Sequence, residues 1–276
     1  MAIATIAGVL AATRLARREG TAAETVVDVA FWTVLAGIAG AKIWFVVQFW
    51  NEFEDKWDLV RNFRSGLVYY GGLVGGTVAV IAYCRLKRLS LLKMLDICSP
   101  PAALGLAFGR LGCFFNGCCY GVETNSWLGV CFRRVVENDT VIGSAAYVDQ
   151  LSSHAISAAD AVTRPLLPTQ LFESGGAVLV FAALLLARRA RRVYGEQTAL
   201  LFVLYPIVRF TVEFFRGDHG PAFAGLTIPQ IFSVAACAAG AAAFAYLRLA
   251  VPAGLAVRAE NAGKEPARAT KTRQAG

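Results

Sequence analysis

Charged residues are scarce in this chain. Only 17% of its 276 residues are Asp, Glu, Lys or Arg, whereas 57% are hydrophobic. A soluble domain normally carries about a quarter of its residues charged, so this composition excludes an ordinary soluble domain. Several apolar runs approach the ~20 residues that a helix needs to cross the hydrocarbon core of a bilayer. The composition therefore predicts a membrane protein.

The chain also has few residues in patterns that bind metals or nucleic acids. Its two histidines, His154 and His219, have no metal-ligand partners at a recognisable spacing, and its seven cysteines do not form the paired clusters of a zinc site. No basic patch is interleaved with aromatic residues, which argues against nucleic-acid binding. Basic residues follow the first apolar run instead of preceding it, so we expect no cleavable signal peptide. We therefore expect no metal, no cofactor and no nucleic-acid partner.

Long apolar segments recur along the chain. They predict an all-α polytopic membrane protein of about seven transmembrane helices, at about residues 2–13, 29–48, 66–84, 101–118, 171–187, 197–215 and 226–247. Residues 1–250 then form a single transmembrane domain. The stretch of about 121–168 has few long apolar runs and predicts a small insert on the outer side. Residues 251–276 are small, polar and basic, and predict a disordered cytoplasmic tail.

Basic residues are distributed unevenly between the apolar segments. Of the 27 Lys and Arg residues, 17 follow the first, third and fifth segments or lie after the seventh, all on one side of the membrane. Because cytoplasmic loops carry an excess of Lys and Arg, we expect the N-terminus outside and the C-terminus in the cytoplasm. The same asymmetry accounts for the net charge of +8.

With this topology, polar residues of four helices fall at one depth, near the outer surface. They are Tyr69 and Tyr70 in the third segment, Arg110 and Asn116 in the fourth, Gln170 and Glu173 in the fifth, and Arg209, Glu213 and Arg216 in the sixth. The last three share one helical face, because they are spaced i, i+4 and i+7. Ionisable residues within a membrane are costly and usually face a bundle interior or a water-filled cavity. This depth is therefore the candidate functional site.

Structural roles compete with functional ones at several of these positions. Arg209 and Glu213 can form an ion pair that only stabilises the fold. The small-residue pairs formed by Gly71, Gly72, Gly75 and Gly76, and by Gly105 with Gly109, are typical of close helix packing, which we favour over a catalytic role. Asp96 falls near the inner side, where we favour a structural role.

Three of the seven cysteines, Cys113, Cys118 and Cys119, fall close together in the sequence. Cysteine is a common small apolar filler, so packing is the interpretation we place first. A structural disulfide, for example to Cys131, is second, because an outer location permits disulfides. A catalytic role comes last.

The segment Gly109–Gly121 combines an arginine, an asparagine and four glycines. It resembles the signature of the prolipoprotein diacylglyceryl transferases, approximately G-R-x-G-N-F-x-N-x-E-x-x-G, at Gly109, Arg110, Gly112, Phe114, Asn116 and Gly121. Further segments resemble that family in the same order: Tyr70–Gly75, Pro168–Glu173, Tyr205–Asp218 and Leu226–Ser233. The resemblance covers about residues 10–248.

The resemblance implies an enzyme of the bacterial cytoplasmic (inner) membrane that acts in lipoprotein biosynthesis. Such enzymes move the sn-1,2-diacylglyceryl group of phosphatidylglycerol to the lipobox cysteine thiol of a prolipoprotein signal peptide, and release glycerol phosphate. Guanidinium groups can hold the phosphate bidentately and stabilise the charge that grows on it. The predicted catalytic residues are Arg110, Arg209, Tyr70, Glu173 and Glu213. The predicted substrate-binding residues are Asn116, Gly71, Gly72, Gly121, Gln170, Tyr205 and Arg216.

The chain departs from the family pattern at three informative positions. Tyr70 stands where most members carry a histidine, and a tyrosine hydroxyl with a pKa near 10 is a poor base at neutral pH. Cys113 and Cys118 replace an asparagine and an acidic residue of the signature. These changes leave two alternatives to a working transferase: a non-catalytic or retasked lipid-binding paralogue, and a membrane thiol-redox protein that uses the cysteines.

Overall fold

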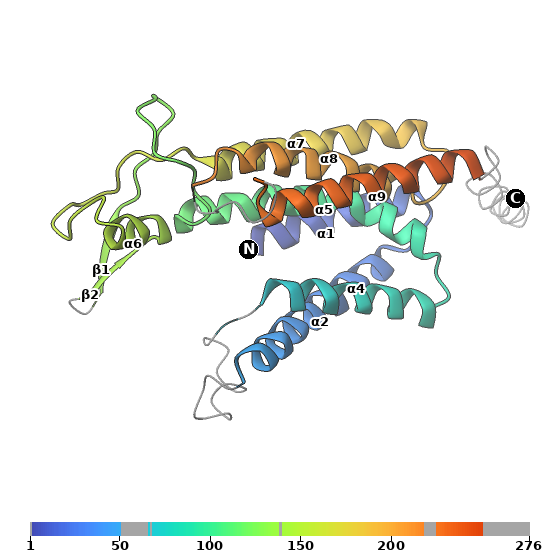
Figure 1. Cartoon of the computed structure of the whole chain (residues 1–276). Coiled ribbons are helices and arrows are strands. Elements are labelled where there is room, and N and C mark those ends of the chain that lie inside the picture. Colours follow the sequence, from blue (N-terminus) through green and yellow to red (C-terminus); the bar gives the residue numbers. More distant parts are fainter. Residues whose placement is uncertain (1, 51–65, 67, 138–139, 218–224, 251–276) are drawn as a thin grey trace, which may run out of the picture. The chain divides into compact units, whose positions relative to one another are not determined.

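The computed structural model describes residues 2–50, 66, 68–137, 140–217 and 225–250 (Figure 1). These residues form two compact units. One runs from Val9 to Ile97, and the larger unit contains the described residues before and after that stretch. The predicted tail of residues 251–276 lies outside the described part of the chain. The assignment of residues 1–250 to a single domain stays a prediction.

Helices dominate the structure and confirm the all-α class. The long helices are α1 (Ala2–Arg18), α2 (Ala23–Phe49), α4 (Tyr69–Leu86), α5 (Leu91–Asn116), α7 (Thr169–Ala187), α8 (Glu196–Glu213) and α9 (Ile228–Ala250). Each overlaps one predicted apolar segment, although α5 begins ten residues and α2 six residues before the predicted start. A short 3-10 turn, η2 (Arg188–Ala190), follows α7.

Four of these helices are long and apolar enough to cross a membrane: α2, α5, α9, and α7 together with the turn that follows it. They confirm a membrane protein with several spans. Helix α4 is apolar but shorter, and α8 carries Glu196, Arg209 and Glu213 within its 18 residues. The total of seven spans stays a prediction.

Glycines allow α2 and α4 to pack closely within the Val9–Ile97 unit (Figure 1). A Cβ atom at Gly71 would collide with the backbone oxygen of Gly40 and with the Cβ of Trp44. A Cβ atom at Gly75 would collide in the same way with the backbone oxygen of Ala36. The expectation of close helix approach at this glycine pair is therefore confirmed.

The second predicted glycine pair behaves differently. No described residue has an atom within 4 Å of the position that a Cβ would occupy at Gly105, Gly109 or Gly112 on α5. No helix of the larger unit approaches closely at Gly105 and Gly109 in the part of the chain that the structure describes, and close packing at this pair stays a prediction. Sequence spacing shows that a helix face is smooth, but it does not show whether another helix covers that face.

We expect Gly71→Ala to destabilise the protein by about 1–3 kcal/mol, because the added methyl group meets fixed backbone. Thermal unfolding of the detergent-solubilised protein measures this effect. Gly105→Ala is the matched control: its methyl group enters open space, and alanine favours a helix by up to about 1 kcal/mol over glycine. Equal melting temperatures for the two variants would contradict the packing role of Gly71.

In the larger unit, α7, α8 and α9 lie side by side (Figure 1). Ala103 of α5 and Val180 and Leu184 of α7 form a buried cluster, against which apolar residues of α7 and α8 pack. Glycines again permit close contact: a Cβ at Gly240 of α9 would lie 2.8 Å from the backbone of Phe202 on α8. This packing fixes the axial positions of α7 and α8, which carry most of the candidate site.

The predicted insert of about 121–168 has a small core of its own. It contains the antiparallel strands β1 (Arg134–Glu137) and β2 (Thr140–Gly143) and the helix α6 (Ala145–Ser152). Tyr120, Phe132, Ala146 and Leu166 form its buried cluster. Hydrogen bonds from Tyr120 Oη to Asp149 Oδ2 (2.5 Å) and from Tyr147 Oη to the Asp160 carbonyl (2.8 Å) fasten α6. The side of the membrane on which the insert lies stays a prediction.

Candidate active site

The buried carboxylate of Glu173 on α7 joins side chains of three helices. Glu173 Oε1 lies 3.1 Å from Arg110 Nη2 of α5 and accepts a hydrogen bond of 2.7 Å from Tyr205 Oη of α8. The same oxygen lies 3.9 Å from Arg209 Nε of α8. The Glu173 side chain is only 1% exposed, so its charge depends on these partners for stabilisation. The structure thus brings together four residues that the sequence predicted for the site.

A second carboxylate, Glu213 at the end of α8, extends this cluster. It pairs with Arg209 Nη1 one turn earlier, and its Oε2 lies 3.8 Å from Arg216 Nε. Thr227 Oγ1 donates a 2.8 Å hydrogen bond to Glu213 Oε1. Arg209 therefore bridges the two carboxylates, and Glu213 connects α8 to the start of α9.

Thr227 is a site residue that sequence reasoning missed. It precedes α9, and its backbone N–H donates to Gln230 Oε1 at 2.9 Å while its hydroxyl accepts from Gln230 N at 3.4 Å. This reciprocal pair is a capping box, which a Thr followed three residues later by Gln indicates in the sequence. The helix cap could therefore be predicted from the sequence. The hydrogen bond between Thr227 and Glu213 could not, because it depends on how α8 and α9 are placed relative to each other.

The site carries a formal excess of positive charge. Three guanidinium groups, of Arg110, Arg209 and Arg216, face two carboxylates, so the cluster has a formal charge of +1. Each guanidinium offers five N–H donors in a planar fork, so Arg110 and Arg209 can hold a carboxylate and a further anion together. The side chains of Arg110 and Arg209 are 20% and 13% exposed. The arrangement can therefore bind an anion such as a phosphate.

The segment after α5 holds this cluster in place through its backbone. Gly121 N donates to the Leu167 carbonyl at 2.9 Å, and Val122 N donates to the Phe215 carbonyl at 3.0 Å. A Cβ at Gly121 would lie 2.5 Å from the Phe215 oxygen. Glycine at this position therefore lets the end of α5, the start of α7 and the end of α8 meet.

Gln170 is buried at the start of α7, one turn from Glu173. Its Nε2 donates a 2.7 Å hydrogen bond to the Cys118 carbonyl. Its Oε1 is buried and has no hydrogen-bond partner among the described residues. A buried acceptor without a partner is costly, so this oxygen is available for a donor group of a substrate.

The remaining predicted residues are spread over both units. Asn116 is the last residue of α5 and is exposed. Tyr70, Gly71 and Gly72 lie at the start of α4 in the Val9–Ile97 unit. The Tyr70 side chain is 55% exposed, whereas the contacts of Gly71 are those of helix packing. A substrate-binding role for the two glycines stays a prediction.

Comparison with known proteins identifies the family. A family model described as prolipoprotein diacylglyceryl transferase matches residues 1–246. The chain belongs to this family. A phosphatidylglycerol–prolipoprotein diacylglyceryl transferase of Clostridium tetani is 29% identical over 235 residues, which are 85% of each chain. A second enzyme of that name from Clostridium perfringens is 31% identical over 82% of each chain. A third, from Finegoldia magna, is 31% identical over 85% of this chain and 84% of its own.

The cysteines of this diacylglyceryl transferase family member are all free thiols. The seven cysteines lie within the described residues, and none forms a disulfide, so the alternative of a disulfide to Cys131 is wrong for this structure.

Cys119 follows the end of α5. A hydrogen bond from Cys113, and then the charges of Arg216 and Arg110, hold the pKa of Cys119 well below its usual range although burial opposes this shift.

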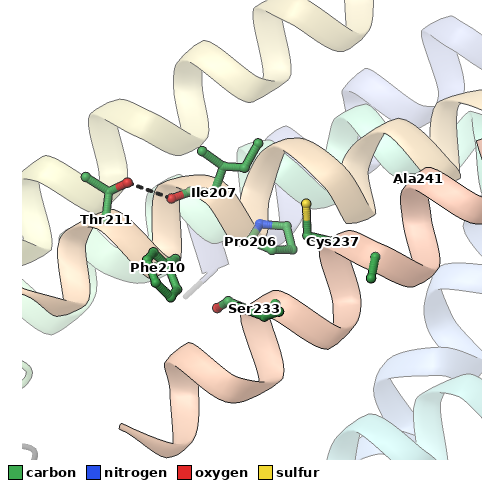
Figure 2. Close-up of a pocket in the computed structure, with 9 residues that line it drawn as sticks. Pro206, Ile207, Phe210, Thr211, Ser233, Cys237 and Ala241 are labelled. Atoms are coloured by element: carbon green, nitrogen blue, oxygen red, sulfur yellow. Dashed lines mark hydrogen bonds between the residues drawn. The ribbon is translucent and has the colours of Figure 1, made fainter. Parts of the chain in front are cut away.

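An apolar groove of about 410 Å³ lies between α8 and α9 (Figure 2). Pro206, Ile207 and Phe210 line it from α8, and Ser233 and Cys237 line it from α9. The Thr211 hydroxyl donates a 2.9 Å hydrogen bond to the Ile207 carbonyl of the same helix (Figure 2), so its donor is already used within α8. Phe210 directly follows Arg209. The groove therefore lies along the same stretch of α8 that carries Arg209, and its lining residues were not predicted from the sequence.

Proposed function

We propose that this protein transfers the sn-1,2-diacylglyceryl group of phosphatidylglycerol to the lipobox cysteine thiol of prolipoproteins. The observation that carries the proposal is the pairing of Arg110 and Arg209 on the buried carboxylate of Glu173. Membership of the prolipoprotein diacylglyceryl transferase family and the names of the relatives support it. A lipid phosphate would meet two guanidinium groups whose positions are already fixed.

In this reaction the sulfur of the lipobox cysteine attacks the glyceryl carbon that carries the phosphate. The carbon–oxygen bond breaks, the thiol proton passes to a base, and glycerol phosphate leaves with the bonding electrons. Negative charge grows on the departing phosphate, so preorganised cations stabilise the transition state more than the ground state. We assign this role to Arg110 and Arg209, and assign Glu173 and Glu213 to hold them in place.

We assign the other polar residues to the head group and the lipid. Gln170 Oε1, the buried acceptor without a described partner, is suited to a hydroxyl of the glycerol head group. Asn116 is exposed at the end of α5 and can hydrogen-bond the same group. We place one acyl chain in the groove between α8 and α9, whose lining includes Phe210, the residue after Arg209.

We also propose that the protein lies in the bacterial cytoplasmic (inner) membrane, with the N-terminus outside and the C-terminus in the cytoplasm. The distribution of 17 of the 27 basic residues supports this orientation. With it, the site faces the outer leaflet. Fusions to a periplasmic reporter enzyme after α5 and after α9 test it, and an active reporter after α9 would contradict it.

Complementation tests the proposed function directly. We expect the gene to restore growth and lipoprotein modification in a bacterium depleted of its own diacylglyceryl transferase. Purified protein should also lipidate a lipobox peptide from phosphatidylglycerol vesicles. Failure of well-expressed, membrane-inserted protein in both assays would contradict the proposed function and favour the alternative of a non-catalytic or retasked lipid-binding paralogue, which is motivated by Tyr70 in place of the family's histidine.

The same assays separate the transferase from a thiol-redox protein. A thiol-redox protein would lose its function in Cys113→Ser and tolerate Arg110→Ala. We expect Arg110→Ala to lose activity and Cys113→Ser to keep it. Arg110 contacts the central carboxylate of Glu173, and the transferase reaction needs no thiol of the enzyme itself.

We expect Tyr70→Phe to lower turnover at least about tenfold, since it removes a hydroxyl that can hydrogen-bond a charged substrate group. Initial rates with the lipobox peptide measure the effect. Tyr246→Phe on α9 is the matched control, because that side chain is also exposed (69%) and lies outside the candidate site. Undiminished turnover of the Tyr70 variant would remove Tyr70 from the mechanism.

A further inference from the structure

Three cysteine thiols meet where α5 ends. The Sγ atoms of Cys113, Cys118 and Cys119 all lie within 4.8 Å of one another, and each residue is partly buried. Two of them stand at signature positions where the family resemblance leads to an asparagine and an acidic residue. The cluster is thus a property of this chain, and the proposed transferase reaction does not use it.

The fold around the cluster holds the three thiols in place. Gly117 and Cys119 adopt left-handed backbone conformations, with φ of +64° and +59°, so the chain turns back over the last turn of α5. Cys118 N donates to the Cys113 carbonyl at 3.1 Å, which closes this turn. The turn is also fastened to α7.

The hydrogen bonds that join this turn to α7 are accepted by main-chain carbonyls and do not involve the thiols. Gln170 Nε2 donates to the Cys118 carbonyl at 2.7 Å, and Thr169 Oγ1 donates to the Cys119 carbonyl at 2.9 Å. Both donors are buried at the first turn of α7. The backbone of Cys118 and Cys119 is therefore held in position by hydrogen bonds that a metal ion bound to the thiols would leave intact.

The sequence spacing predicted no metal site, but the folded chain brings three thiols together, and we propose that Cys113, Cys118 and Cys119 bind one soft metal ion, with Cu(I) preferred. Thiolates are the ligands that select Cu(I) and Zn(II) over harder ions. Three sulfur atoms at about 2.3 Å from a central ion are about 4 Å apart, which is close to the observed separations of at most 4.8 Å. Structural zinc sites use four ligands, and no fourth His, Cys, Asp or Glu joins this group in the part of the chain that the structure describes.

The surrounding charge suits such a site. Three thiolates and one monovalent ion carry a formal charge of −2. Arg110 and Arg216 act electrostatically on Cys119, and their positive charges offset part of this excess. A divalent ion would need less compensation, but it would lack a fourth protein ligand within the described residues.

Metal titration of the reduced full-length protein in nanodiscs tests the proposal. Under anaerobic conditions, with Cu(I) supplied from a chromophoric bicinchoninate complex, we expect one equivalent to transfer to the protein. X-ray absorption should report three sulfur ligands at about 2.3 Å. We expect Cys118→Ser to weaken binding at least about 100-fold, whereas Cys131→Ser, which changes an exposed cysteine outside the cluster, should bind as the unaltered protein does. Zn(II) should bind more weakly than Cu(I).

A second measurement needs no variant and so does not depend on how a variant folds. Bound Cu(I) should protect Cys113, Cys118 and Cys119 from alkylation, as mapped by mass spectrometry, and leave Cys131 reactive. The proposal is overturned if Cu(I) protects none of the three thiols. It is also overturned if the unaltered protein and the triple serine variant take up equal Cu(I), or if Zn(II) binds more tightly than Cu(I).

Discussion

Arg110→Ala is expected to lower the rate of diacylglyceryl transfer at least about 100-fold, the scale seen when one donor to a developing negative charge is removed. Arg110 contacts Glu173 at 3.1 Å and is one of the two guanidinium groups that we assign to the phosphate. Its loss removes a cation from the transition state and one of the partners of a buried carboxylate. Initial rates at saturating lipid separate this effect from weaker binding, since a transition-state contact lowers turnover itself.

Two further variants sharpen this experiment. Arg110→Lys keeps the charge but loses the planar fork, so we expect a rate between those of the unaltered protein and the alanine variant. Arg164→Ala is the matched control: Arg164 pairs with Glu123 at 3.6 Å in the insert, and its side chain is 56% exposed. If Arg110→Ala and Arg164→Ala have the same rate, the phosphate role of Arg110 is wrong.

The helices could be predicted from the sequence because their signal is local. Each long apolar run became a helix. The bounds of α7 (Thr169–Ala187) differ by two residues from the predicted 171–187, whereas α5 begins at Leu91, ten residues before the predicted 101, because a helix can extend beyond its apolar stretch. The convergence of Arg110, Glu173 and Arg209 also followed from the predicted topology, since successive spans run in opposite directions and bring the end of one beside the start of the next. Burial in the membrane leaves few places for such residues.

The parts that sequence reasoning missed depend on contacts between elements. Thr227 showed a cap signal, but its hydrogen bond to Glu213 requires the relative position of α8 and α9. The open face at Gly105 depends in the same way on which helix lies opposite. The thiol cluster depends on the left-handed conformation of Cys119, which a residue other than glycine seldom adopts. Neither periodicity nor composition carries this information.

Glu173→Gln is expected to destabilise the protein by about 3–5 kcal/mol, the range found when one partner of a buried ion pair is removed. The amide can still accept the hydrogen bond from Tyr205, but Arg110 and Arg209 lose the negative charge that they share. Chemical unfolding in detergent, followed by circular dichroism, measures the change. Tyr205→Phe is the control that removes only the neutral donor, and we expect it to cost about 0.5–1.5 kcal/mol.

A double variant decides whether the loss of stability in Glu173→Gln comes from uncompensated positive charge. If it does, Glu173→Gln combined with Arg110→Gln should be more stable than the sum of the two single effects predicts, because the second change removes one of the cations left without a partner. Two effects that simply add would mean that Glu173 stabilises the fold through packing and hydrogen bonding alone. The rate of diacylglyceryl transfer should not recover in the double variant. Stability depends on balancing the buried charges, whereas the transition state requires the guanidinium of Arg110 beside the departing phosphate.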